Sequence, residues 1–223
     1  MTRGNGMARR AAAPLCTIAL LALAVVTGVA AAAAKPADET TVAVIGAGAK
    51  GQALGDLWAA AGYHVIFAAP HSDRGAAAAA QAGHDARSAP IARAVARADI
   101  AVLAVPYGTE PAIARAHGGA MKGKILVDTD KAVESRDGDV AAQAELVGQA
   151  VYSARLFKGT RFVRAFNLKE ADAFPKPDAV ATAGFRVPWT TNDPSVRPAA
   201  EALIRATGGT PAYEGGLENA REY

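Results

Sequence analysis

Cysteine is nearly absent from this chain of 223 residues, because its single copy, Cys16, lies within the first 34 residues. The rest of the chain therefore offers no disulfide, no thiolate nucleophile and no cysteine ligand for a metal. Its four histidines lack metal-ligand spacing, and the sequence contains no Ser/His/Asp grouping. We therefore expect no metal centre, and a domain that depends on its hydrophobic core.

Acidic side chains are missing from residues 1–34, which contain Arg3, Arg9 and Arg10. The remainder carries 21 basic and 21 acidic side chains, so the formal charge of +3 belongs entirely to this leader. A protein that binds nucleic acid needs a surplus of Lys and Arg on one face. The neutral body therefore predicts that nucleic acid is not a partner.

The leader has the parts of an export signal. Arg9 and Arg10 precede an uncharged stretch over residues 11–34, and the alanines at 30–34 offer cleavage sites. We predict a cleaved signal peptide at residues 1–34 and a periplasmic or secreted protein, and the paired arginines also indicate twin-arginine export. The alternative is an uncleaved leader, long enough to cross a bilayer, that anchors the protein in the inner membrane.

After a polar linker at residues 35–40, apolar runs of strand length alternate with alanine-rich helical segments. The expected strands are 41–45, 64–69, 85–88, 100–105, 124–128, 161–166, 186–190 and 211–213. The expected helices are 49–61, 74–82, 91–97, 141–157 and 194–207. Strands joined by helices require crossover connections, and these predict a mostly parallel sheet covered on both faces. We predict a Rossmann-type, doubly wound α/β fold with one nucleotide-binding domain at 41–223.

A glycine-rich turn follows the first expected strand and opens the first expected helix. Gly46, Gly48 and Gly51 form the pattern Gly-x-Gly-x-x-Gly, which in this context is typical of dinucleotide-binding turns. The glycines allow a tight turn, a close approach of the backbone to a pyrophosphate, and close packing of helix on strand. With Ala49 and Lys50, they are the predicted pyrophosphate-binding residues, at a helix N-terminus that favours anions.

The end of the second expected strand distinguishes NADP from NAD. An NAD site usually places an acid there for the ribose 2′-hydroxyl, whereas an NADP site supplies groups for a 2′-phosphate. No acid directly follows the strand here, and His71, Ser72 and Arg74 can meet a phosphate. NADP(H) is therefore the predicted cofactor, although an inward-facing Asp73 would favour NAD.

Five segments resemble the coenzyme F420-dependent NADP oxidoreductase family, and they lie at 46–70, 98–107, 122–128, 163–167 and 215–221. The resemblance implies hydride transfer between NADP(H) and a deazaflavin, with related proteins reducing flavins or metals. It implies that Val105, Pro106 and Tyr107 border the nicotinamide, and that Asn167 lies near the redox centre. No catalytic acid or base is required by such chemistry, and Asn167 and Tyr107 are candidate positioning residues.

The resemblance has departures near the expected site. The family commonly has Ser-Arg where this chain has Ala69-Pro70, and Thr-Asn-Pro where it has Thr129-Asp130-Lys131. The first departure would move the 2′-phosphate contact to Ser72 or Arg74. The second departure lies in the loop after the strand expected at 124–128, on the substrate side, so the family's substrate contacts in this loop do not carry over directly.

The leading hypothesis is an NADP(H)-dependent oxidoreductase whose partner is a small redox acceptor, such as F420 or a flavin, in a protein that could be a homodimer. The alternative is a non-catalytic NAD(P)-binding redox sensor or accessory module. A third reading, a reductase of small imines similar to pyrroline-carboxylate reductases, shares the glycine fingerprint. Such enzymes normally carry a further helical dimerisation domain.

Overall fold

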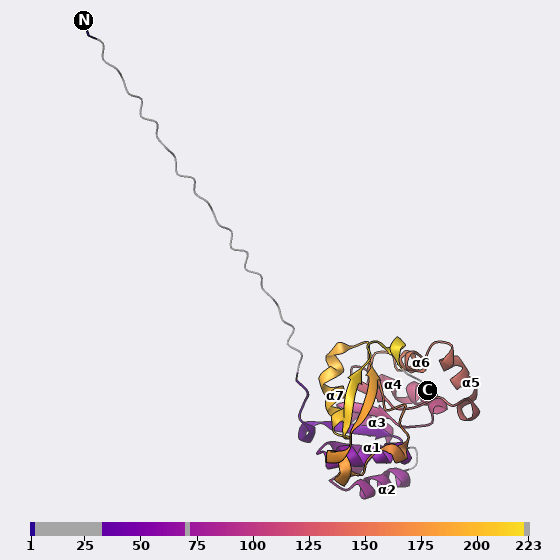
Figure 1. Cartoon of the computed structure of the whole chain (residues 1–223). Helices are drawn as coiled ribbons and strands as arrows, with labels where there is room; N and C mark the ends of the chain where they lie inside the picture. Colours follow the sequence, from indigo (N-terminus) through magenta and orange to yellow (C-terminus); the bar gives the residue numbers. More distant parts are fainter. Residues whose placement is uncertain (3–32, 70–71, 221–223) are drawn as a thin grey trace. The chain divides into compact units, whose positions relative to one another are not determined.

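An eight-stranded sheet forms the centre of the protein in a computed structural model that describes residues 1–2, 33–69 and 72–220 (Figure 1). The predicted signal peptide, with Cys16, lies almost wholly outside the described residues, and so does His71. The described residues from 33 onward belong to one compact unit. Within the described ranges, no helix has the length and apolar character needed to cross a bilayer.

The strands lie in the order β3-β2-β1-β4-β5-β6-β7-β8. Their bounds are β1 Thr41–Ile45, β2 His64–Ala68, β3 Arg87–Ser88, β4 Ile100–Leu103, β5 Ile125–Asp128, β6 Arg161–Ala165, β7 Phe185–Thr190 and β8 Gly209–Tyr213. All neighbouring pairs are parallel except β6 and β7. The first six strands have the order typical of a Rossmann fold, which confirms the predicted fold class.

Helices cover both faces of the sheet (Figure 1). Their bounds are α1 Ala49–Ala60, α2 Ser72–Ala82, α3 Ile91–Arg97, α4 Glu110–Met121, α5 Glu134–Glu145, α6 Gln149–Leu156 and α7 Arg197–Arg205. Short 3-10 turns join them, and the one that matters for the site is η2 at Tyr107–Thr109. Because successive strand residues point to opposite faces, each strand contributes to both layers of the core.

Two hydrophobic clusters fill these layers. Val42 and Val44 of β1 pack with α1, α2 and α7 on one face, whereas Ala43 and Ile45 pack with α3, α4 and α6 on the other. Trp58 of α1 is fully buried, and its indole N–H donates to the carbonyl oxygen of Leu203 in α7. The first layer therefore ties the N-terminal and C-terminal parts of the sheet together.

The segment after β4 differs from the sequence prediction. Residues between Pro106 and Lys122, where we expected no helix, form η2 and α4. The Gly118-Gly119 pair indicated a loop, but the acid and proline at the start of α4 are favourable at a helix N-terminus.

The single helix predicted at 141–157 is also wrong, because two helices, α5 and α6, occupy this region. Gly148 precedes α6 with a φ of 86°, in a conformation that a continuing helix cannot adopt. Within α5, Gly138 has a φ of 52° and interrupts the helix near its start. The predicted helix began after Gly138 and ran across the break at Gly148.

Candidate functional site

A pocket of about 530 Å³ lies at the carboxyl ends of β1 and β4. These strands are neighbours at the centre of the sheet, where the strand order reverses direction. Ligands of open α/β sheets bind in the crevice at this switch point. Of the residues predicted to bind the cofactor, five line this pocket: Gly46, Gly48, Arg74, Val105 and Pro106.

The three glycines of the turn have different surroundings. A β-carbon on Gly46, whose φ is 114°, would lie 2.1 Å from the carbonyl oxygen of Ala104. One on Gly51 would lie 2.1 Å from the carbonyl oxygen of Gly46, so this helix packs directly on the turn. A β-carbon on Gly48 would meet nothing within 4 Å. The open position is the exposed one at the helix N-terminus, which is the cradle that a pyrophosphate requires.

The far end of the pocket contains a cation and no acid. Arg74 of α2 lines it, whereas Asp73 accepts a hydrogen bond from the Ser72 hydroxyl at 3.2 Å and is exposed. Ser72 lines a neighbouring pocket of about 180 Å³, which shares Ala69 with the larger one. The structure therefore places Arg74 and Ser72 on adjoining hollows and turns Asp73 away from both. His71, the third predicted phosphate ligand, lies outside the described residues.

The wall formed by Val105 is held by a buried acid. The backbone N–H of Val105 donates to Asp130 Oδ1 at 2.9 Å, and the backbone N–H of Asp130 donates to Asp128 Oδ1 at 2.9 Å. Asp128 ends β5, so this chain of bonds joins the ends of β4 and β5. Asp128 and Asp130 are both buried.

Tyr107 faces the protein interior. It is fully buried, its hydroxyl donates to the carbonyl oxygen of Gln149 at 2.8 Å, and it accepts from the Ser153 hydroxyl at 2.9 Å. Burial raises the pKa of Tyr107 well above its usual range. The side chain of Tyr107, the first residue of η2, thus points toward α6 and does not line the pocket.

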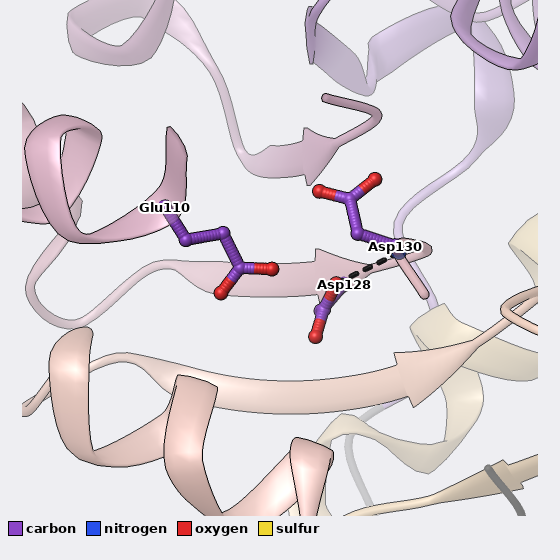
Figure 2. Close-up of side chains that lie close together, drawn as sticks. All are labelled: Glu110, Asp128 and Asp130. Atoms are coloured by element: carbon purple, nitrogen blue, oxygen red, sulfur yellow. Dashed lines mark hydrogen bonds between the residues drawn. The ribbon is translucent and has the colours of Figure 1, made fainter. Parts of the chain in front are cut away.

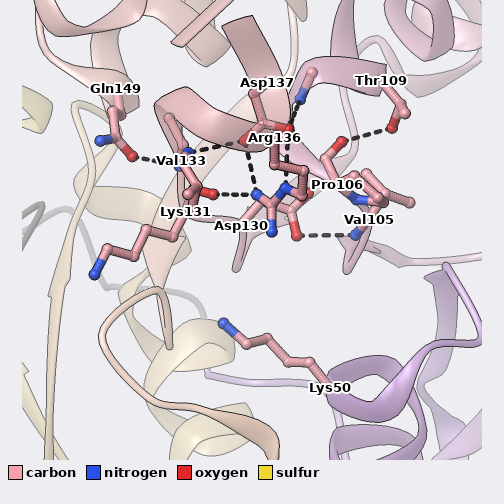
Figure 3. A network of polar contacts seen from close by, with 12 residues as sticks. Lys50, Val105, Pro106, Thr109, Asp130, Lys131, Val133, Arg136, Asp137 and Gln149 are labelled. Carbon is pink, nitrogen blue, oxygen red and sulfur yellow. Dashed lines mark hydrogen bonds and ion pairs between the residues drawn. The ribbon is translucent and has the colours of Figure 1, made fainter.

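A polar clamp fixes η2 next to the pocket (Figure 3). Asp137 accepts from the backbone N–H groups of Gly108 at 3.0 Å and Val133 at 2.8 Å, and Arg136 forms an ion pair with it at 2.8 Å. These bonds hold the pKa of Asp137 below its usual value even though burial opposes them. The clamp therefore fixes the segment that carries Pro106 and Thr109.

Three acids that the sequence analysis did not connect lie together beneath the site (Figure 2). Glu110, Asp128 and Asp130 are buried, and their carboxylate oxygens lie within 4.8 Å of one another. Arg164 of β6 forms a buried ion pair with Asp128. Burial, followed by the charge of Asp128, raises the pKa of both Glu110 and Asp130 well above their usual values.

Oxygen ligands of this kind suit a hard cation such as Mg²⁺. However, the guanidinium of Arg164 already neutralises Asp128, and burial favours the protonated forms of the other two acids. The cluster therefore favours protonated Glu110 and Asp130 over a bound cation. Glu110 was missed because the helix that begins with it was not predicted.

Lys50 and Asn167 lie along the same edge of the sheet, beyond the pocket. Lys50 extends from the first turn of α1 (Figure 3). Its ammonium donates to the carbonyl oxygen of Thr129 at 3.0 Å. Asn167 is buried just after β6, and it lines a hollow of about 180 Å³ with Phe166 and Phe185. Phe166 has a φ of 65°, which is uncommon for a bulky residue and marks a constrained backbone beside Asn167.

The predicted site residues therefore fall into three groups. The first group lines the main pocket and consists of Gly46, Gly48, Arg74, Val105 and Pro106. The second lies at its margins and consists of Ala49, Lys50, Gly51 and Ser72. The third faces elsewhere and consists of Tyr107, in the core, and Asn167, in the neighbouring hollow. Thr109, Ala112 and Ile113 also line the pocket and were missed, because they belong to η2 and α4.

Comparison with known families matches residues 41–131 to the family described as NADP oxidoreductase, coenzyme F420-dependent. This confirms over these residues the resemblance seen in the sequence. No curated protein sequence matches the chain.

Among solved structures, a hypothetical protein from Sinorhizobium meliloti is 27% identical, with a TM-score of 0.67 over 81% of this chain and 87% of that one. A putative F420-dependent NADP reductase from an Arthrobacter species is 20% identical, with a TM-score of 0.62 over 80% and 86%. An imine reductase from Myxococcus stipitatus in complex with NAD⁺ is 21% identical, with a TM-score of 0.58, and the chain covers only 56% of it. The comparisons thus support an NAD(P)-dependent oxidoreductase on a Rossmann fold.

Proposed function

We propose that this protein is an NADP(H)-dependent oxidoreductase that transfers hydride between NADPH and a flavin-like or deazaflavin acceptor such as coenzyme F420. The observation that carries the proposal is the pocket at the switch point, in which Gly48 leaves open space at the N-terminus of α1. The match of residues 41–131 to a family of NADP oxidoreductases supports the same assignment. When bound, the dinucleotide supplies the hydride, and the protein binds and orients the two rings.

Arg74 favours NADP(H) over NAD(H). It lines the pocket, and among the described residues it has no carboxylate within ion-pair distance, so its guanidinium is available to a 2′-phosphate. The Ser72 hydroxyl lines the adjoining hollow and can add a second contact. The pocket lining includes no Asp or Glu that would select the ribose 2′-hydroxyl of NAD.

The acceptor would lie along the sheet edge between Val105 and Asn167. Val105 and Pro106 form the end of the dinucleotide pocket on the β4 side, and Asn167 lines the hollow after β6. β5 separates these two strands in the sheet, so the space between them lies above its carboxyl end. A stacked pair of rings needs this kind of ordered edge, because hydride transfer depends mainly on orientation.

Acceptor-dependent oxidation of NADPH tests the proposal. Purified protein is mixed with NADPH or NADH and with F420, FMN, FAD or ferric chelates, and the loss of reduced nicotinamide is followed by absorbance. We expect turnover with NADPH and at least one flavin-like or deazaflavin acceptor. Tight binding of NADPH without turnover by any acceptor would favour the alternative function, a redox sensor or accessory module.

Reduction of imines is a second candidate because imine reductases share this fold. The chain spans about half of those enzymes, so the candidate rests on the nucleotide-binding half alone. Adding a cyclic imine to the same acceptor panel distinguishes it. Preferential turnover of the imine would replace the flavin-like acceptor in the proposal.

We further propose that residues 1–34 direct export of the folded, nucleotide-loaded protein. NADP is mainly cytoplasmic, and twin-arginine export would carry the bound cofactor across the membrane. The mature N-terminus, measured by mass spectrometry of the periplasmic fraction, should lie near residue 35. Replacing Arg9 and Arg10 by Lys should retain the protein in the cytoplasm, and unchanged export would contradict this route.

A further inference from the structure

Lys50 occupies an unusual place for a lysine. It belongs to the first turn of α1, two residues after Gly48 of the pocket, and its side chain is half-buried. Its ammonium reaches across to the carboxyl end of β5, where it donates to the carbonyl oxygen of Thr129 at 3.0 Å. β5 lies between β4, which leads to Val105, and β6, which leads to Asn167. The ammonium therefore lies at the part of the sheet edge assigned to the acceptor.

The surroundings of Lys50 leave its proton transferable. Among the described residues no carboxylate lies within ion-pair distance of it, and its hydrogen bond in this structure goes to a neutral carbonyl. Burial lowers the pKa of Lys50 from its usual 10.5, while the more distant charges of Glu170 and Asp130 oppose this change. An ammonium held in this way is a better acid than an exposed lysine.

The neighbouring acid supports the same position. Asp130 holds the pocket wall through the N–H of Val105, and it directly follows the residue whose carbonyl receives Lys50. Its second oxygen, Oδ2, is buried and has no hydrogen-bond partner among the described residues. Lys50 is thus connected to the pocket from two sides, by the chain through Gly48 and by the Thr129–Asp130 segment that supports Val105.

We propose that Lys50 is the general acid that protonates the acceptor when it receives hydride from NADPH. The inference rests on the proposed function and adds a catalytic residue to it. As the C4–H bond of the dihydronicotinamide breaks, its electron pair and hydrogen form a C–H bond at C5 of a deazaflavin, or an N–H bond at N5 of a flavin. The ring nitrogen N1, which is conjugated with that position, gains electron density and takes a proton from Nζ of Lys50. Lys50 becomes a neutral amine and regains a proton from solvent, and in the reverse direction it accepts the proton.

Three variants separate a proton donor from other roles. Lys50→Met removes the proton and the charge, Lys50→Arg keeps a charge that is not transferable at accessible pH, and Lys158→Met changes an exposed lysine as a control. We expect both Lys50 variants to lower kcat by about 100-fold, within the range that general acid catalysis supplies. We expect the Kd for NADPH to stay within about threefold and the control to keep its kcat.

The pH dependence supplies the next test. Wild-type kcat should fall at high pH as Lys50 loses its proton, and this fall should be absent from the Lys50→Met profile. If Lys50→Arg kept the kcat of the wild-type protein, a positive charge without a transferable proton would be sufficient. The role of Lys50 would then be electrostatic, and that result would overturn the inference. A raised Kd for NADPH with unchanged kcat would do the same, because Lys50 would then be a pyrophosphate contact.

A measurement without turnover completes the test. Competitive acetylation of the ligand-free protein across pH, read by peptide mass spectrometry, gives the pKa of the Lys50 amine even if the variants fold poorly. We expect the pKa of the Lys50 amine to lie below its usual value of 10.5, and a measured pKa at or above that value would contradict the inference. Absence of turnover in the wild-type protein would refute the proposed function and this inference together. Turnover that is unchanged in Lys50→Met would refute the inference alone.

Discussion

Gly51 packs against Gly46 so closely that a β-carbon on Gly51 would lie 2.1 Å from the carbonyl oxygen of Gly46. The contact joins the first turn of α1 to the residue that ends β1, so it sets the position of the helix N-terminus. Gly51→Ala should lower the free energy of unfolding by about 3 kcal/mol, because backbone atoms must move to admit the methyl group. Urea unfolding measures the change.

Gly48→Ser is the matched control for this prediction. The position has an ordinary φ of −85°, and a β-carbon there meets nothing within 4 Å. Its free energy of unfolding should change by less than about 0.5 kcal/mol. Equal destabilisation of the two variants would show that the close packing at Gly51 is not what stabilises the turn.

Gly48→Asp should abolish binding of the dinucleotide while the protein still folds. The added carboxylate has room in the ligand-free protein, but it places a negative charge where the pyrophosphate would lie. We expect the Kd for NADPH to rise by at least about 100-fold, or ~3 kcal/mol, as measured by quenching of NADPH fluorescence.

Gly119→Asp, an exposed position of α4 with open space around it, should leave the Kd unchanged. Circular dichroism checks that both proteins are folded. Retained binding in a folded Gly48→Asp protein would place the dinucleotide elsewhere.

Arg74→Ala should weaken the binding of NADPH more than the binding of NADH. Loss of a charged contact to the 2′-phosphate costs about 1.5–3 kcal/mol, which corresponds to roughly a 10- to 150-fold rise in Kd for NADPH. The Kd for NADH should change by less than about threefold. Arg115→Ala, an exposed change on α4, serves as the control. Equal effects on the two nucleotides would exclude the 2′-phosphate role of Arg74.

The buried acids predict how stability depends on pH. Burial raises the pKa of Glu110 and Asp130 above their unfolded values of 4.5 and 3.8, so the folded state holds protons that the unfolded state has lost. The free energy of unfolding should therefore fall as the pH rises from about 5 to 8, by at most ~1.4 kcal/mol per pH unit for each group.

Glu110→Gln removes one of the two groups that hold a proton in the folded state after the unfolded state has lost it. The free energy of unfolding of this variant should therefore fall less steeply over the same pH range than that of the wild-type protein. Urea unfolding at several pH values measures the slope, and Glu145→Gln, at an exposed site, should keep the wild-type slope. An identical slope in Glu110→Gln would mean that Glu110 is ionised in the folded protein.

The strands and the phosphate-binding turn were accessible to sequence analysis because their signals are local. The predicted strand at 41–45 became β1 with the same bounds; four of its five residues, Val42–Ile45, are apolar, and Gly46 follows directly. The strand expected at 64–69 became β2, His64–Ala68, and its first residue is exposed. The strand expected at 186–190 became β7, in which Trp189 is buried against Tyr213 with ring centroids 4.8 Å apart.

The acid cluster and the direction of Tyr107 could not be predicted in the same way. Glu110 meets Asp128 only because α4 begins beside the end of β5, and this contact joins segments far apart in the sequence. Tyr107 follows a strand end like a pocket residue, but its hydroxyl finds partners on α6, a helix whose bounds were also missed. Lys50 was assigned to the pyrophosphate by its motif alone, and its contact with Thr129 required the fold.

Transfer of deuterium from NADPH tests the central claim most directly. NADPH labelled at C4, on one face or the other, is incubated with the protein and with F420, 5-deaza-FMN or 5-deaza-FAD. In these acceptors the transferred hydrogen ends on carbon, so it does not exchange with solvent and mass spectrometry detects it. The account predicts that one of the two labelled forms gives a singly deuterated reduced acceptor. Reduced acceptor that contains no deuterium from either form, or no reduced acceptor at all, would contradict it.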